Sequence, residues 1–349
     1  MLQGFEWHVP ADQRHWKRLR MALPNLKDLG VDNIWIPPAC KGMESTGTGY
    51  DVYDLYDVGE FDQKGSRATR WGPKEDLQEL VWSAKDFGIG IIWDTVLNHK
   101  AGADFTEKFS AVKVDSRSKY SVSRVQTVLL EDNSLQTDRN IEIEKPEDIT
   151  AWVGFDFPGR GGKYSSMRYR HQHFNGVDWD ESRSQNAIYK VSDPQKKWSS
   201  NVSDEHGNYD YLMFANLDQD HPEVRADLFK WAEWIGSEFS LSGMRIDAAK
   251  HYSASFQRDL VNHLRKTVGA NYLFVSEYWR GEVGYLLEYL KILKGSVSLF
   301  DVPLLGRISE TSQTECGDLR KIFKGTLVEQ SPDHAVVRSM RSYPGICCC

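Results

Sequence analysis

The chain has 349 residues, of which 40% are hydrophobic, and its net charge at pH 7 is -7. This length exceeds one average domain and suits one large domain with an insertion. The negative charge argues against a nucleic-acid partner, because phosphate binding requires a basic face. No apolar run approaches the roughly 18 residues of a membrane span, and the first seven residues lack the pattern of a secretory signal. We therefore expect a cytoplasmic protein that binds no membrane.

Strand-like apolar runs alternate with helix-like segments along much of the chain. The expected strands cover residues 2–7, 33–37, 89–96, 243–247, 272–277 and 297–302. Apolar residues recur at spacings of three and four in the expected helices, which cover residues 15–29, 74–87, 223–239 and 255–268. Alternation of this kind predicts an α/β architecture built on a parallel sheet.

A run of about 110 residues, 100–210, interrupts this alternation after the third strand and is too long for a plain loop. Within it, residues 121–130 and 141–144 are consistent with short strands. Glycines and aromatic residues follow from 152 to 179. The run is therefore expected to have structure of its own.

Three of the expected strands end in charged side chains. Arg245 and Asp247 lie two residues apart in an apolar strand, so they share one face of it. A guanidinium beside a carboxylate favours the charged form of that carboxylate, which is what a covalent nucleophile requires. Glu277 ends a strand about thirty residues later, the length of one βαβ unit, and Asp94 ends an upstream strand. These strand ends are expected to meet at one site.

Four further motifs occur in order along the chain: LQGFEW at 2–7, NIWIPP at 33–38, YDLYD at 53–57 and NYDYLM at 208–213. Together with the strand ends, they make the chain resemble the alpha-amylase family of retaining glycoside hydrolases, in its liquefying bacterial and intracellular fungal branch. The resemblance runs from residue 2 to about residue 336. It implies an α/β fold class, an incomplete (β/α)8 TIM barrel at 1–99 and 211–336 with a β-rich domain inserted at 100–210.

The resemblance implies endo-hydrolysis of α-1,4-glucosidic bonds in starch or glycogen with retention of configuration. Asp247 matches the nucleophile and Glu277 the general acid and base, while Arg245 keeps the nucleophile charged. Retaining hydrolysis needs two carboxyl groups about 5 to 5.5 Å apart, one ionised and one protonated. A carboxyl near Tyr278 and Trp279 could have the raised pKa that the acid needs.

Several substrate contacts are also implied by the resemblance. Asp94 matches the carboxylate that holds the site arginine. Tyr50 matches an aromatic platform for the sugar, and His99 matches a histidine that hydrogen-bonds the same sugar. Lys250 and His251 follow the nucleophile strand, where the family binds the leaving part of the glucan.

A single Ca²⁺ is the implied cofactor, since calcium prefers six to eight hard oxygen ligands. Asn98, Asp210 and the backbone carbonyl of His251 match the family's ligands at the junction of barrel and insertion. Asn216 stands where close relatives have Asp, which should weaken affinity. A second ion is not expected, because Asn175 and Ser199 occupy two positions of the family's further acidic cluster, although Asp218 and Asp220 are retained.

The resemblance breaks after Val336, where the family continues with a strand that carries a third catalytic carboxylate. Residues 337–349 instead form an aberrant tail. One interpretation is a frameshift, retained intron or mispredicted exon, which the abrupt break favours. The other is a genuine shortened product, lacking two of eight barrel strands and exposing sheet edges. For the chain as written we expect weak hydrolysis or none.

Two alternative functions stay open from the sequence. A 4-α-glucanotransferase would use the same residues but transfer the glucan to a sugar acceptor, so its products would be redistributed chain lengths. A non-catalytic glucan-binding remnant would keep starch affinity without turnover. In each case the expected partner is an α-glucan polysaccharide or oligosaccharide, and the expected state is a monomer.

Overall fold

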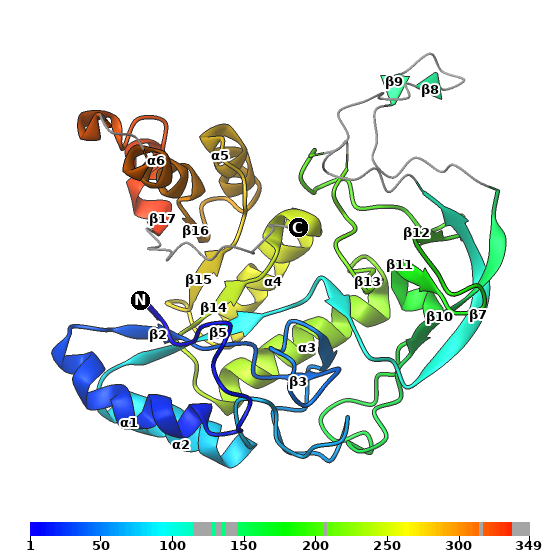
Figure 1. The fold of residues 1–349 in the computed structure, drawn as a ribbon, viewed down its shortest axis with the longest axis horizontal. Helices are drawn as coiled ribbons and strands as arrows, with labels where there is room; N and C mark the ends of the chain where they lie inside the picture. The colour runs from blue at the N-terminus through cyan, green and yellow to red at the C-terminus, as the bar shows by residue number, and fades with distance from the viewer. Residues whose placement is uncertain (115–127, 130–134, 137–144, 206–207, 314–316, 337–349) are drawn as a thin grey trace.

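The computed structural model describes residues 1–114, 128–129, 135–136, 145–205, 208–313 and 317–336. Two sheets dominate this part of the chain, one parallel and one antiparallel (Figure 1). Most of the predicted strands at 121–130 and 141–144 and the predicted tail at 337–349 lie outside the described residues. No described helix is both long and apolar enough to cross a membrane.

The parallel sheet has seven strands, and all six pairings between them are parallel. In spatial order they are β1 (Leu2–Gln3), β2 (Asn33–Trp35), β5 (Gly90–Thr95), β14 (Gly243–Ile246), β15 (Leu273–Ser276), β16 (Ser298–Phe300) and β17 (Ala335–Val336). The order follows the sequence, as in a barrel wall, but β1 and β17 do not pair with each other. The sheet is an incomplete barrel, as expected.

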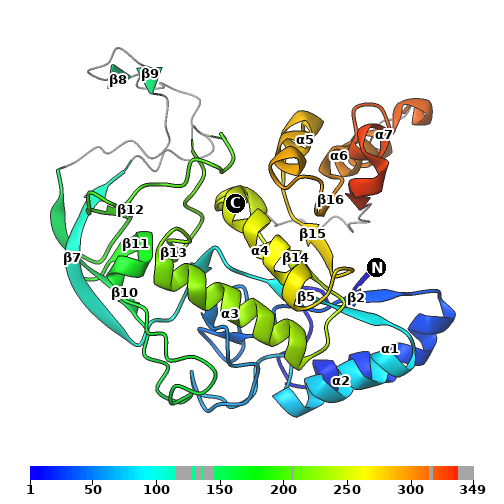
Figure 2. The same cartoon turned by 180° about the vertical axis from the view of Figure 1, so that it is seen from behind.

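Helices connect these strands and cover the outer face of the sheet (Figures 1 and 2). They are α1 (His15–Asp28), α2 (Lys74–Asp86), α3 (Pro222–Glu238), α4 (Ala254–Thr267), α5 (Val283–Ile292), α6 (Val302–Ser312) and the short α7 (Leu327–Gln330). Their buried residues recur at helical spacing, as Trp16, Leu19 and Leu23 do in α1. The Ser253 side chain caps α4 by accepting a hydrogen bond from the N–H of Phe256.

The antiparallel sheet has six strands and lies to one side of the parallel sheet (Figure 1). In spatial order they are β10 (Glu147–Gly154), β7 (Phe105–Lys113), β12 (Gln185–Val191), β11 (Phe174–Asp180), β13 (Ala215–Leu217) and β6 (His99–Lys100). Two smaller pairs are β3 (Lys41–Gly42) with β4 (Val52–Asp54), and β8 (Val128–Leu129) with β9 (Leu135–Gln136). The inserted β-rich region is therefore real, and β6 and β13 join it to the barrel.

Alternate residues of the parallel strands enter two different cores. Ile34, Ile91 and Met244 pack towards the helices in the main core. Trp35, Ile92, Val275 and Phe300 form a separate cluster on the other face, the inside of the incomplete barrel. This period of two is what places charged residues of the same strands on the inner face as well.

The structure confirms the six predicted barrel strands and the four predicted helices to within a few residues. One expectation was wrong, because the described chain has seven parallel strands where six were expected. Ala335 and Val336 pair in parallel with Leu299 and Phe300, so the segment just before the tail contributes a short strand. Two residues give too little periodicity to be recognised from sequence.

Candidate active site

Three adjacent parallel strands place four charged side chains at one end of the sheet. Asp94 in β5 lies directly opposite Arg245 in β14. Asp247 and Glu277 follow immediately after β14 and β15, and their backbone N–H groups still donate across the sheet, to the carbonyls of Thr95 and Ile246 at 3.1 and 2.9 Å. The ladder thus fixes the two carboxyl groups at neighbouring strand ends, as the sequence predicted.

Arg245 connects all three carboxyl groups. Its Nη1 donates to Asp94 Oδ1 at 2.5 Å and to Asp247 Oδ1 at 2.7 Å, and its Nη2 donates to Glu277 Oε2. Asp94, Arg245 and Asp247 are buried, and the Glu277 side chain is 22% exposed. One guanidinium thus holds Asp247 and Glu277 at once, so the two carboxyl groups lie near the same cation.

The charges of this cluster do not cancel. Burial raises the pKa of Asp247 to about 7, and the nearby charges of Asp94 and Glu277 add to the rise, although Arg245 opposes it. Burial also raises the pKa of Asp94. Arg245 thus favours the charged form of Asp247, as expected, while burial and the two neighbouring carboxyl groups oppose it.

Tyr50 and His99 lie beside the cluster. The Tyr50 hydroxyl donates to Asp94 Oδ2 at 2.8 Å, and its ring stacks on the exposed Trp7 ring, with centroids 5.8 Å apart and planes at 15°. His99 Nε2 lies 2.8 Å from the Tyr50 carbonyl oxygen. Burial lowers the pKa of His99 to about 4, so the ring is neutral near pH 7.

Lys250 and His251 follow a tight turn after β14. Ala248 adopts left-handed angles there, with φ 47° and ψ 37°. Lys250 Nζ forms an ion pair with Glu205 and donates to the Trp279 carbonyl at 3.1 Å. The His251 ring packs on Tyr209, with its Nδ1 3.1 Å from the Tyr209 carbonyl oxygen. Nothing in the sequence indicated that Glu205 would be the partner of Lys250.

The predicted calcium ligands gather where β6 meets β13. Asn216 pairs in register with His99, the N–H of Leu217 donates to the Asn98 carbonyl at 2.9 Å, and Asn98 Nδ2 donates to the His251 carbonyl at 3.0 Å. The contact of His251 with the Tyr209 carbonyl brings Asp210 to the same place. The structure therefore brings the four predicted ligand residues together, one from β13 and three from segments outside the two sheets.

Buried oxygens at this junction lack hydrogen bonds. Within the described residues, Asp210 Oδ1, Asn216 Oδ1 and Asn175 Oδ1 are buried and have no hydrogen-bond partner. Asp210 Oδ2 accepts from the N–H of Ser199 at 2.7 Å. Burial raises the pKa of Asp210 to about 7, with that hydrogen bond opposing and the Asp218 charge adding to the rise. Buried polar atoms are seldom left without a partner, so these oxygens fit a cation.

The hydrogen bonds of Asn98 also favour a cation at this junction. His99 is neutral and carries one N–H, yet both ring nitrogens face oxygens, the Tyr50 carbonyl at 2.8 Å and Asn98 Oδ1 at 3.1 Å. Turning the Asn98 amide over would satisfy His99, and the amide keeps its shape when turned. It would then set two oxygens, those of Asn98 and the His251 carbonyl, about 3.0 Å apart. A cation between them resolves that conflict.

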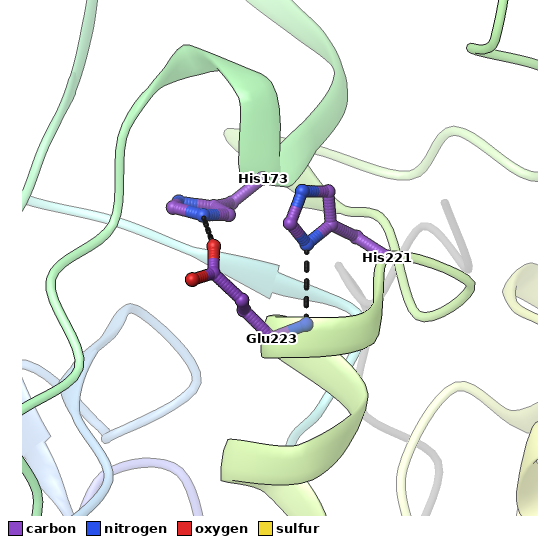
Figure 3. Close-up of side chains that lie close together, drawn as sticks. All are labelled: His173, His221 and Glu223. Carbon is purple, nitrogen blue, oxygen red and sulfur yellow. Dashed lines mark hydrogen bonds and ion pairs between the residues drawn. The ribbon is translucent and has the colours of Figure 1, made fainter.

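A second group of metal-ligand types, His173, His221 and Glu223, lies at the start of α3 (Figure 3). His173 Nδ1 accepts the N–H of Arg170 at 2.9 Å, so Nε2 carries the proton and donates to Glu223 Oε2 at 3.0 Å. His221 Nδ1 accepts the N–H of Glu223 at 3.3 Å and caps the helix. Because the Nε2 lone pair of His173 is not available, this group is a hydrogen-bonded helix cap.

Comparison with known proteins identifies the family. The family model described as alpha amylase, catalytic domain, matches residues 15–281, about three quarters of the chain. The chain belongs to the alpha-amylase family. The strand ends that carry Asp94, Arg245, Asp247 and Glu277 all lie within the matched region.

Several characterised relatives of this alpha-amylase family chain cover nearly all of it. It is 44% identical to the glucan 1,4-alpha-maltohexaosidase of Bacillus sp. (strain 707), over 96% of this chain and 61% of that protein. It is 43% identical to the alpha-amylase of Bacillus licheniformis, over 96% and 62%, and 35% identical to the cytoplasmic alpha-amylase of Escherichia coli (strain K12), over 96% and 65%. The chain thus spans about three fifths of the length of these relatives.

Solved structures of the family share the fold. An alpha-amylase from Geobacillus thermoleovorans, complexed with acarbose, matches with a TM-score of 0.56 at 18% identity, over 92% of this chain and 52% of that one. An alpha-amylase from Malbranchea cinnamomea matches with a TM-score of 0.51 at 15% identity, over 92% and 51%. At these identities the comparison supports the architecture alone.

Proposed function

We propose that the chain carries the catalytic centre of an alpha-amylase, which hydrolyses α-1,4-glucosidic bonds of starch or glycogen inside the polymer and retains the anomeric configuration. The observation that carries the proposal is the single guanidinium of Arg245, which holds Asp247 and Glu277 at adjacent strand ends. The names of the long relatives, alpha-amylase and maltohexaosidase, support the same substrate class.

The reaction would proceed in two displacements. An Asp247 oxygen attacks the anomeric carbon, and the bond between that carbon and the leaving oxygen breaks. Glu277 gives its proton to the leaving oxygen. Ionised Glu277 then takes a proton from water, whose oxygen attacks the same carbon and releases Asp247. Arg245 orients both carboxyl groups, and Asp94 orients Arg245. Tyr50 would provide an apolar ring for the sugar, His99 a neutral hydrogen-bonding ring, and Lys250 a contact for the leaving glucan.

Calcium is part of the proposal, because the junction residues fit it. Asn98, Asp210, Asn216 and the His251 carbonyl would hold the ion, which would supply structural cross-linking between the inserted region and the barrel. The unpaired buried oxygens support this assignment. The aromatic contact between Tyr209 and His251 then positions the segment that leads back to Asp247.

The rest of the assignment concerns context. We place the barrel at residues 1–99 and 211–336 and the inserted domain at 100–210. We propose a cytoplasmic monomer, in keeping with the relative from Escherichia coli that is named as cytoplasmic. Its partner would be an α-glucan, with no nucleic acid or membrane involved.

A trapping experiment tests the chemistry directly. A maltooligosaccharyl fluoride needs no acid to leave, so Glu277→Gln should still be glycosylated on Asp247 while hydrolysis of the covalent intermediate slows. Mass spectrometry of a peptide digest should find the added sugar on Asp247, and Asp247→Asn should give no adduct. Lys108→Met, which changes an exposed ion pair with Asp148 in the inserted domain, is the control.

The products and the binding separate the alternatives. Free reducing ends from a blocked maltooligosaccharide indicate hydrolysis, whereas redistributed chain lengths indicate a glucanotransferase. Acarbose binds the Geobacillus thermoleovorans relative, so calorimetry with acarbose tests for a binding remnant. Binding without adduct or turnover would contradict the enzymatic proposal and support that alternative.

A further inference from the structure

Trp35 lies inside the incomplete barrel, below the charged cluster. It ends β2 and pairs in register with Ile92 of β5, two residues before Asp94. Only 2% of it is exposed, and its neighbours in the inner cluster are Ile92, Val275 and Phe300. Sugar cannot reach the ring, so any effect of Trp35 on the reaction must pass through other side chains.

The indole contacts both members of the ion pair that supports the nucleophile. Its Nε1–H donates to Asp94 Oδ2 at 3.0 Å, on the opposite side of the carboxyl group from Arg245. The Arg245 guanidinium carbon lies 4.8 Å from the centre of the indole ring, within the range of a cation–π contact. The same ring therefore holds the anion through its edge and the cation through its face.

We propose that Trp35 is a positioning residue of the active site, which sets how the charge of Arg245 is divided between Asp94 and Asp247. This inference rests on the proposed function, because it assigns a role within the same centre. Asp94 Oδ1 accepts a hydrogen bond from Arg245, whereas Asp94 Oδ2 accepts hydrogen bonds from Trp35 and Tyr50. The two donors at Oδ2 favour the anionic form of Asp94. Anionic Asp94 in turn keeps its ion pair with Arg245 Nη1.

The neighbouring rings explain why Trp35 keeps one orientation. Phe5 meets it edge-on, with centroids 5.3 Å apart and planes at 88°, and Phe300 lies 5.7 Å away. Phe300 belongs to the same cluster, and Phe5 packs against it. The inner cluster therefore fixes the indole in the orientation that lets its N–H reach Asp94.

The test removes the indole N–H without changing the shape of the ring. Benzothienylalanine, incorporated site-specifically at position 35, replaces N–H by sulfur. We expect the pKa of Asp94, followed by ¹³C NMR of its carboxyl carbon, to rise by about one unit, because the charged form loses a donor. With Asp94 more easily protonated, the pKa of Asp247 should fall. Trp35→Phe should shift both groups in the same directions, and Lys108→Met in the inserted domain should shift neither.

Coupling and kinetics complete the test. In an Asp94→Asn background, loss of the indole N–H should leave the pKa of Asp247 unchanged, because the proposed route is broken. The acidic decline of kcat/KM should move to lower pH together with the pKa of Asp247, and KM should stay unchanged, since Trp35 does not reach the substrate. Unchanged pKa values in the benzothienylalanine protein would overturn the inference, whatever the activity. Shifted pKa values in a protein that never turns over glucan would uphold the inference and reject the proposed function.

Discussion

The active centre and the β6–β13 junction solve the same physical problem in two ways. Both bury a carboxyl group, and burial raises the pKa values of Asp247 and Asp210 to about 7. The active centre contains its own cation, Arg245, which bonds three carboxyl groups. The junction leaves oxygens of Asp210, Asn216 and Asn175 without hydrogen bonds in the described structure.

This difference teaches which site depends on its surroundings. A resident guanidinium is covalently attached, so the active centre is assembled whenever the sheet forms. The junction lacks a resident cation on its unpaired oxygens, so its stability should depend on the ions in solution. Removing the resident cation and supplying the external one are therefore the sharpest ways to test the comparison.

The largest effect should follow from Arg245→Met. The change leaves Asp94, Asp247 and Glu277 close together without their shared cation, and breaking a buried pair from one side costs about 3–5 kcal/mol. We expect this loss in the free energy of unfolding, measured in urea at pH 8 with calcium present. The loss should shrink as the pH falls below about 7, because without Arg245 the carboxyl groups then take up protons. A variant as stable as the parent at pH 8 would contradict the role of Arg245.

Calcium should give the next largest effect. At a hundred times its dissociation constant, a ligand that binds only the folded state adds about 2.7 kcal/mol. We expect calcium to raise Tm by several degrees over EDTA, as measured by scanning calorimetry, and Asp210→Asn to remove most of that gain. Magnesium should do less, because it requires a tighter octahedral site.

The matched control for calcium is Asp180→Asn, in the same sheet. Asp180 is also buried, but it accepts hydrogen bonds from Thr150, Ser182 and Arg183, so it needs no ion. This variant should lose stability equally with and without calcium. Equal calcium gains in the parent and in Asp210→Asn would place the ion elsewhere.

A smaller and pH-dependent effect should follow from Asp247→Asn. The folded pKa near 7 exceeds the ordinary value of about 3.9, so between these values the folded state binds the extra proton. The free energy of unfolding therefore falls as pH rises from about 4 to about 7. Above pH 7 Asp247 is charged in the folded state, and its buried charge lowers the free energy of unfolding by the full amount. Asn carries no such charge, so the variant should be more stable than the parent at pH 8, by on the order of 1–3 kcal/mol, and no more stable at pH 4.

The same pKa shapes the activity of the parent. Below pH 7 the nucleophile becomes protonated, so kcat/KM should decline towards a tenfold loss per pH unit. Stability and activity thus respond to Asp247 in opposite directions. If Asp247→Asn gave the same stability change at pH 4 and pH 8, the raised pKa would be wrong.

Sequence alone predicted the positions of the site residues well, for a simple geometrical reason. Arg245 and Asp247 share a strand face, and parallel strands place Asp94 and Glu277 at the same sheet end. Family resemblance added the proposed calcium ligands Asn98 and Asp210, which no local pattern marks. Short strands such as β17 were missed because two residues have no measurable period.

The features that sequence did not predict depend on contacts between residues far apart in the chain. The pKa of Asp247 reflects burial and three neighbouring charges, whereas the sequence shows only the nearest arginine. Trp35 reads as an ordinary apolar strand residue, and its indole N–H matters only because β2 lies beside β5. The partner of Lys250 is Glu205, 45 residues away in the chain, and only the closed fold brings them together.

The smallest effect should come from the His173, His221 and Glu223 group. This group tests the comparison with a site whose residues resemble metal ligands but are already hydrogen-bonded. Both ring nitrogens of His173, Nδ1 of His221 and the Glu223 carboxylate already have hydrogen-bond partners, and the Glu223 side chain is 63% exposed. Glu223→Gln keeps the helix cap from His221 and should therefore cost less than about 1 kcal/mol. Zinc should not raise Tm in either protein, because His173 Nε2 bears a proton. Zinc would contradict this expectation if it raised the Tm of the parent and Glu223→Gln abolished the rise. A group whose polar atoms are hydrogen-bonded would then bind a metal, and unpaired oxygens would not distinguish the calcium site from such a group.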